Sequence, residues 1–146
     1  MIALPSELHI DSFAVLRSFY KFFPPQKAIK DPLKIFKSYD IDIDFSHKEN
    51  ENGTIRVFTK IAVNQNENPL PGYKLFVEGT AVFSFDKKDT TKKEEEKNLK
   101  YYSTVSILIG YLRSTLTSLT ASSPFGIYVL PPIDMIDLFR KKAEKD

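Results

Sequence analysis

The last third of the chain, residues 107–139, carries a long apolar helical pattern that runs into a Ser-Ser-Pro turn. An apolar extended segment follows at residues 127–130, and after a Pro-Pro break comes a short amphipathic helix. This segment has no neighbouring strand in the sequence. Because apolar side chains and unpaired main-chain groups are unfavourable in water, the segment must be covered by the chain's own sheet, by another subunit or by a bound polypeptide.

Four runs before residue 86 have the character of strands. Residues 8–23 are rich in aromatic and β-branched side chains, while residues 40–45, 54–63 and 73–85 alternate apolar and polar side chains, which is typical of half-buried strands. Short turns join the last three runs. We therefore expect an antiparallel meander, with the first strand added through the longer connection at 26–39. Gly79 inside the fourth run indicates a bulge or a close approach of another segment.

A long helix is expected at about 99–121. Its apolar side chains recur with a spacing of coiled-coil type, and Gly110 is expected to mark a kink. Further apolar residues widen the surface beyond one face, so the helix should lie between two layers, the second of which is expected to be another subunit. The candidate oligomer interface is Tyr101, Val105, Leu108, Leu112, Leu116 and Leu119.

A second, shorter helix is expected at about 134–145, with Asp134 placed to cap its first turn. Between the strands and the helices, residues 86–97 contain five lysines and five acidic residues. We interpret them as a solvated loop, with a charge patch for a partner as the alternative. The chain, residues 1–146, is thus expected to form one α+β domain: a four-stranded antiparallel sheet with one long and one short C-terminal helix.

Composition narrows the functional classes. The formal charge is +2 and the pI is about 8.6, which is too balanced to indicate a nucleic-acid partner. The absence of cysteine excludes disulfides and thiolate sites. The first residues lack the basic and apolar regions of a signal peptide, and no apolar run reaches the roughly 18 residues of a spanning helix. We expect a cytoplasmic protein without membrane insertion.

Catalytic patterns are sparse. The two histidines, His9 and His47, lie at a strand start and in a charged turn. No phosphate-binding, metalloprotease or nucleophile-elbow motif occurs. The row Asp40, Asp42 and Asp44 shares one strand face, which is either the solvent face of that strand or a site for a cation or a basic partner. We expect no enzyme activity, no cofactor and no metal.

Apolar side chains gather instead in the irregular segments. The chain carries twelve Phe and seven Tyr, more than a small core readily hides. Each residue alone is explained as well by the core. As a set, aromatic and Met side chains beside exposed main chain suit extended peptides of many sequences. The candidate peptide-binding groove is Phe22, Phe23, Ile29, Leu33, Phe36, Phe125, Ile127, Tyr128, Val129, Ile133 and Met135.

The last third also carries a series of short motifs: Tyr111-Leu112-Arg113, Pro124-Phe125, Leu130-Pro131-Pro132-Ile133-Asp134-Met135 and Leu138-Phe139. In order and spacing they resemble SecB, the export chaperone of the bacterial cytoplasm, and its relatives. The order of elements matches along the whole chain, but only the C-terminal third is specific. The resemblance implies a homotetramer, a dimer of dimers, whose long apolar grooves hold unfolded preproteins without ATP.

The chain departs from the SecB pattern at two places. Ile109-Gly110 stands where the family often has Phe-Pro, and Phe76 stands at one of the acidic positions through which the export chaperone docks its SecA motor. Glu78 and the aspartate row lie nearby, so SecA stays open as a partner. The leading hypothesis is a SecB-like holdase for unfolded polypeptides. The alternatives are a dedicated or antitoxin-associated chaperone for one partner, and a small enzyme or ligand-binding protein.

Overall fold

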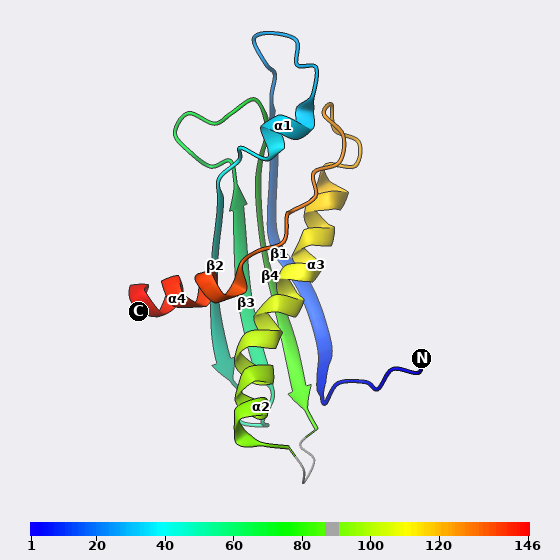
Figure 1. Cartoon of the computed structure of the whole chain (residues 1–146), viewed down its shortest axis with the longest axis vertical. Coiled ribbons are helices and arrows are strands. Elements are labelled where there is room, and N and C mark those ends of the chain that lie inside the picture. Colours follow the sequence, from blue (N-terminus) through cyan, green and yellow to red (C-terminus); the bar gives the residue numbers. More distant parts are fainter. Residues whose placement is uncertain (87–90) are drawn as a thin grey trace.

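The computed structural model describes residues 1–86 and 91–146 and contains a four-stranded antiparallel sheet with helices on one of its faces (Figure 1). The strands are β1 Leu8–Phe23, β2 Ile41–Glu49, β3 Ile55–Val63 and β4 Gly72–Phe85, in the spatial order β1-β4-β3-β2. The last three form the expected meander, and the crossover between β1 and β2 places β1 beside β4. The predicted α+β class is confirmed.

A continuous helical rod runs obliquely across the sheet (Figure 1). It consists of α2 Lys93–Asn98, a π-helical turn at Leu99–Ser103 and α3 Thr104–Leu119. The helix thus begins within the stretch 86–97 that we expected to be a loop. Three glutamates occupy its first turn, where the positive end of the helix dipole favours carboxylates. Of that predicted loop, residues 87–90 lie outside the described residues.

The apolar stripe of the rod faces the chain's own sheet. Four of the six residues expected at an oligomer interface are fully buried within the single chain: Val105, Leu108, Leu112 and Leu116. Leu119 also packs against this core, while Tyr101 is partly exposed. A helix on a sheet has the same apolar spacing as a coiled coil, and one sheet is wide enough to cover the stripe. At these positions the stripe therefore packs inside the subunit and not between subunits.

Gly79 on β4 serves both purposes expected of it. The register of β1 against β4 shifts between Val15 and Arg17, beside Gly79, so β1 carries a bulge there. On the covered face, a Cβ added at Gly79 would lie 2.6 Å from Leu112 Cδ2 of α3. A side chain at position 79 would therefore require Leu112 of the rod to shift at the crossing point of rod and sheet.

The crossover between β1 and β2 contains a short helix, α1 Pro32–Phe36, where the sequence indicated only a connection. The carboxylate of Asp31 accepts a hydrogen bond from the Leu33 N–H (3.1 Å) and so caps its first turn. Pro32 occupies the first helical position, where a missing N–H is tolerated. α1 lies at one end of the sheet, close to the segment that follows α3 (Figure 1).

Residues 127–130 are extended but do not form a strand. They lead from the end of α3 back across the molecule toward α4 (Figure 1). The Arg113 Nε of α3 donates a hydrogen bond to the Leu130 carbonyl oxygen (2.8 Å). The side chains of this segment alternate between buried and exposed: Tyr128 and Leu130 are buried, Ile127 and Val129 exposed. The chain's own core therefore covers one side of the segment and leaves the other side open.

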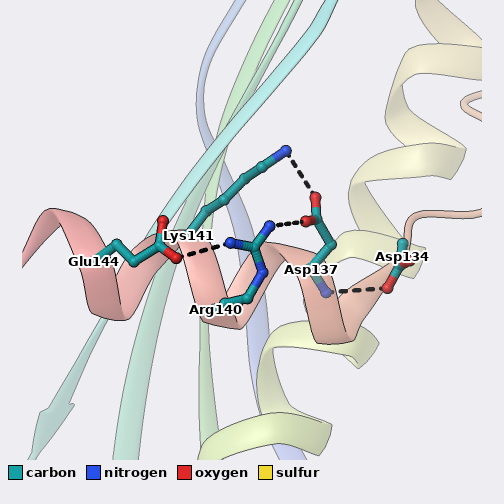
Figure 2. A network of polar contacts seen from close by, with 5 residues as sticks. All are labelled: Asp134, Asp137, Arg140, Lys141 and Glu144. Atoms are coloured by element: carbon teal, nitrogen blue, oxygen red, sulfur yellow. Dashed lines mark hydrogen bonds and ion pairs between the residues drawn. The ribbon is translucent and has the colours of Figure 1, made fainter.

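The C-terminal helix α4, Met135–Lys145, packs beside the edge strand β2. The Asp134 carboxylate accepts a hydrogen bond from the Asp137 N–H (3.0 Å), as the sequence predicted. The Phe139 ring packs against Phe45 of β2, with ring centroids 4.9 Å apart. Figure 2 shows the ion pairs on its outer surface, which join Asp137, Arg140, Lys141 and Glu144.

Candidate functional site

Two segments that the sequence marked as apolar meet at one end of the sheet and enclose a hollow of about 530 Å³. α1 contributes one wall, and residues 127–131 contribute the other. Five of the predicted groove residues line it: Leu33, Phe36, Ile127, Tyr128 and Val129. We call this space the α1 hollow. Its other lining residues are Asp31, Lys34, Lys37, Tyr39, Ile41 and Pro131.

The walls of the α1 hollow are aliphatic and uncovered. Leu33, Ile127 and Val129 expose 62%, 49% and 59% of their surface. Burying one such side chain completely is worth about 1.5–3 kcal/mol. Three exposed aliphatic side chains surround this hollow, so the free energy falls when an apolar group enters it and covers them.

An aromatic cluster forms the floor of the α1 hollow. Phe36 packs edge-on against Tyr128, with centroids 5.4 Å apart, and lies equally far from Tyr73. Phe22 and Phe125, which were also predicted for the groove, continue this cluster as an edge-to-face pair at 5.4 Å. Edge-to-face contacts hold aromatic rings in defined positions. The floor is therefore preformed.

Tyr128 carries a buried hydroxyl at this floor. Burial raises the pKa of Tyr128 to about 12, so the hydroxyl keeps its proton at neutral pH. It has no hydrogen-bond partner among the described residues. The nearby Tyr39 differs, because its hydroxyl donates to the Pro71 carbonyl oxygen (2.8 Å) and accepts from the Tyr73 N–H (2.9 Å). A buried polar group without a partner costs free energy.

A second hollow, of about 330 Å³, adjoins the first along β2. Residues 41–45 of β2, Ile133 and one side of α4 line it, and we call it the α4 hollow. Ile41 lines both hollows. β2 is an edge strand, and among the described residues no strand pairs with its outer side. The two hollows together, which we call the β2 groove, therefore follow this edge strand, on which the Phe45 N–H already donates to the Asp44 carboxylate (2.9 Å).

The charges of the α4 hollow are largely paired with one another. Lys142 Nζ lies 2.9 Å from Asp44 Oδ1, and Lys145 Nζ lies 3.6 Å from Asp44 Oδ2. The hydrogen bond from Lys142 holds the pKa of the Asp44 carboxyl below its ordinary value. Lys141 pairs in the same way with Asp137 (2.7 Å). These contacts leave little unbalanced charge at this end of the groove.

The remaining predicted groove residues do not gather in one place. Ile133 lines the α4 hollow, whereas Met135 lines a separate hollow between the helical rod and α4. Phe23 lies on the face of the sheet away from the helices, where the Lys21 ammonium is 4.9 Å from its ring centroid. Ile29 is half-buried in the crossover.

Sequence reasoning missed several lining residues of the β2 groove. The alternation of residues 40–45 marked Ile41 as a covered side chain, but it did not show that α1 faces it. Nor did the spacing of Lys34 and Lys37 show that both reach the same hollow. A short helix over residues 32–36 was the sequence signal that could have placed these two lysines close to each other.

The residues considered for catalysis or metal binding lie on opposite edge strands. His9 Nε2 of β1 is 3.1 Å from Asp86 Oδ2, and His47 Nε2 of β2 is 2.9 Å from the Tyr101 carbonyl oxygen. Within the described residues, no three His, Cys, Asp or Glu side chains come together as metal ligands. In the same part of the chain, every helix is too short or too polar to cross a membrane.

No protein-family model matches the chain, and no curated protein matches its sequence. Among solved structures, the chain is similar to the SecB-like chaperone Rv1957 of Mycobacterium tuberculosis in complex with a ChAD peptide from the HigA1 antitoxin. The TM-score is 0.56 with 16% sequence identity, over 86% of this chain and 90% of that one. A protein of unknown function from Streptococcus agalactiae matches less well, with a TM-score of 0.45, 8% identity and coverage of 88% and 100%. The first match shows that the chain has a SecB-like fold.

Proposed function

We propose that this chain is an ATP-independent chaperone that binds non-native polypeptides along the β2 groove. The observation that carries the proposal is the coincidence of exposed aliphatic walls with a strand edge that no described strand covers. An extended polypeptide pairs its main chain with such an edge and places alternate side chains in the adjoining hollows. Main-chain pairing does not depend on sequence, so the groove suits clients of many sequences.

The fold supports this proposal. The SecB-like chaperone with a similar fold was solved with a peptide from an antitoxin, so a polypeptide ligand is compatible with this architecture.

Suppression of aggregation tests the proposal. The purified chain, at a stoichiometric ratio, is expected to delay the aggregation of a chemically unfolded client followed by light scattering. The double variant Leu33→Ser/Val129→Ser removes two aliphatic walls, both of which are already exposed, and should lose most of this delay without unfolding. Ile136→Ser is the matched control, because Ile136 is 85% exposed on α4 and does not line the β2 groove.

A folded wild-type chain that gives no delay would contradict the proposal. Retention of one partner at high affinity, together with indifference to unfolded model clients, would instead identify a dedicated chaperone for that partner. Equal activity of the wild type and the double variant would place client binding elsewhere on the molecule.

We also propose that the chain self-associates in the cytoplasm, with the tetramer of the SecB family as the expected assembly. Support comes from an apolar surface that β1 and α3 leave uncovered. The Phe13 ring of β1 lies 5.0 Å from Tyr111 of α3 and joins the two elements. Large apolar side chains on the helix-covered side of β1 and on α3 are 36–42% exposed: Val15, Ile107 and Tyr111.

Docking of the SecA motor is not part of the proposal. The Arg17 guanidinium pairs with the Glu78 carboxylate (2.5 Å) and lies 5.1 Å from the Phe76 ring centroid. Asp44 is likewise held by Lys142. Two of the carboxylates that lie near the position of Phe76 in the SecB pattern, Glu78 and Asp44, therefore carry positive partners from this chain itself.

A further inference from the structure

Resting on the proposed function, we infer that the β2 groove selects apolar client segments flanked by carboxylates. The basis is the uneven distribution of charge along the groove. The α1 hollow is lined by two lysines that form no ion pair with a described residue, whereas each of the three lysines that line the α4 hollow pairs with an aspartate.

Two lysines line the α1 hollow beside its aliphatic walls. Lys34 and Lys37 are both exposed, and neither forms an ion pair with a described residue. The only carboxylate among the described lining residues is Asp31, whose Oδ1 accepts the hydrogen bond from the Leu33 N–H (3.1 Å). That carboxylate is engaged with the start of α1, and the two ammonium groups stay available to a ligand.

The rest of the crossover has the same sign. Residues 24–39 contain four lysines and one aspartate, so the whole segment that forms this wall is positive. The net charge of the crossover is therefore positive, as is that of the charged residues that line the α1 hollow, Asp31, Lys34 and Lys37.

The α4 hollow provides the contrast. Its lysines, Lys141, Lys142 and Lys145, each lie within 4 Å of an aspartate oxygen of the same chain. A client carboxylate at that end would have to compete with these internal partners. At the α1 end, a client carboxylate meets two lysines that have no acidic partner among the described residues. The preference for acidic groups is therefore expected at that end of the groove.

Exposed ion pairs change selectivity more than they change total affinity. A single pair between solvated charges is weak, and apolar burial with main-chain pairing supplies most of the binding. Two such pairs at the rim are expected to favour an acidic flank over a basic one by about three- to tenfold at low salt. At about 1 M salt, where the screening length is about 3 Å, the preference should disappear.

The test uses three labelled peptides of equal length that share one apolar core and carry glutamates, serines or lysines on both sides. Their affinities for the full chain are measured by fluorescence anisotropy at low and high salt. The glutamate peptide is expected to bind about three- to tenfold more tightly than the lysine peptide. The double variant Lys34→Glu/Lys37→Glu should reverse this order.

The matched control is Lys48→Glu/Lys92→Glu, which changes the net charge by the same amount. Lys48 lies opposite Arg56 in the sheet, and Lys92 directly precedes α2, so both positions tolerate a carboxylate. This control should keep the order of the three peptides.

Equal binding of all three peptides to the wild type would overturn the inference and leave the proposed function standing. Reversal of the order by the control variant would also overturn it, because the preference would then reflect net charge. Failure of every peptide to bind, together with no delay of client aggregation, would instead refute the proposed function.

Discussion

Gly79 on the sheet and Gly110 on the rod differ in the space around them. At Gly79 a Cβ would lie 2.6 Å from Leu112 Cδ2 and 3.2 Å from the Ala14 carbonyl oxygen, whereas at Gly110 it would meet nothing within 4 Å. α3 continues as an α-helix through Gly110. The irregularity of the rod lies instead at the π-helical turn, residues 99–103.

Gly79→Ala is expected to lower the free energy of unfolding by about 1–3 kcal/mol, because the added methyl group separates rod and sheet. Gly110→Ala is expected to raise it by up to about 1 kcal/mol, because alanine favours the helix and has room. Urea titration of both variants measures the two effects. Changes of the same sign would contradict this description of the contact.

The two tyrosines near the α1 hollow provide a second matched pair. Tyr39→Phe leaves the Tyr73 N–H and the Pro71 carbonyl without their partner and is expected to cost about 1–3 kcal/mol of stability. Tyr128→Phe removes a buried hydroxyl that has no partner in the described part of the chain. We expect this change to stabilise the free protein by about 1 kcal/mol.

Because the hydroxyl is buried, Tyr128→Phe is expected to leave client binding unchanged. Denaturant unfolding and peptide anisotropy on the same variant separate these effects. A loss of stability comparable to that of Tyr39→Phe would show that the Tyr128 hydroxyl is already bonded in the free protein.

At the scale of elements, β2 and the rod are joined at the π-helical turn. π-helical turns interrupt the regular pattern of helix hydrogen bonds. His47 of β2 donates from Nε2 to the Tyr101 carbonyl oxygen (2.9 Å) and stacks on the Tyr101 ring with centroids 4.7 Å apart. Thr104 Oγ1 donates to the Lys100 carbonyl oxygen (2.8 Å). Side chains from both elements thus complete the hydrogen bonding of this turn.

The contact of His47 with the π-helical turn predicts that the stability of the fold depends on pH. Burial lowers the pKa of His47 most, the Lys142 charge adds to this, and the hydrogen bond with Tyr101 opposes it. The unfolded chain takes up the proton near pH 6.5, and the folded chain takes it up only at lower pH. The unfolded state therefore binds more protons, and stability falls as the pH drops below about 6.5 toward the lower pKa of the folded state.

His47→Gln, which keeps a donor without titrating, should flatten this part of the profile. Unfolding free energies measured between neutral pH and about pH 5 for both proteins provide the comparison. Parallel profiles would mean that His47 does not contribute to the acid sensitivity.

At the scale of the molecule, the uncovered surface of β1 and α3 predicts self-association. Apolar side chains that gather on one surface mark an interaction site more often than apolar side chains scattered singly. Light scattering is expected to give about four times the chain mass of 16.8 kDa. Tyr111→Glu should lower this mass, because it places a charge in the centre of the surface, while Leu33→Glu on α1 is the control that should not. A monomeric wild type would contradict the proposed assembly.

Local patterns were sufficient to predict the four strands, α3 and α4, whereas α1 and α2 fall in segments that were expected to be a connection and a loop. The alternation in β2, β3 and β4, the apolar stripe of α3 and the Asp134 cap of α4 are all properties of neighbouring residues. Strands have a period of two and helices a period of 3.6 whatever packs against them. The prediction of the α1 wall and of residues 127–129 as groove residues rests on the same reasoning, because aliphatic and aromatic side chains in irregular segments stood out.

Contacts between distant segments established the rest. The repeat of apolar residues along a helix shows that one face is covered, but it does not show which surface covers that face. The sequence therefore favoured another subunit as the cover for the apolar stripe of α3, whereas the chain's own sheet buries it. In the same way, residues 127–130 lacked a partner in the sequence but are bound by Arg113 on one side and left open on the other. The position of Lys34 and Lys37, which form no ion pair in the described part of the chain, depends on α1 folding back toward that opening, and no local pattern contains that information.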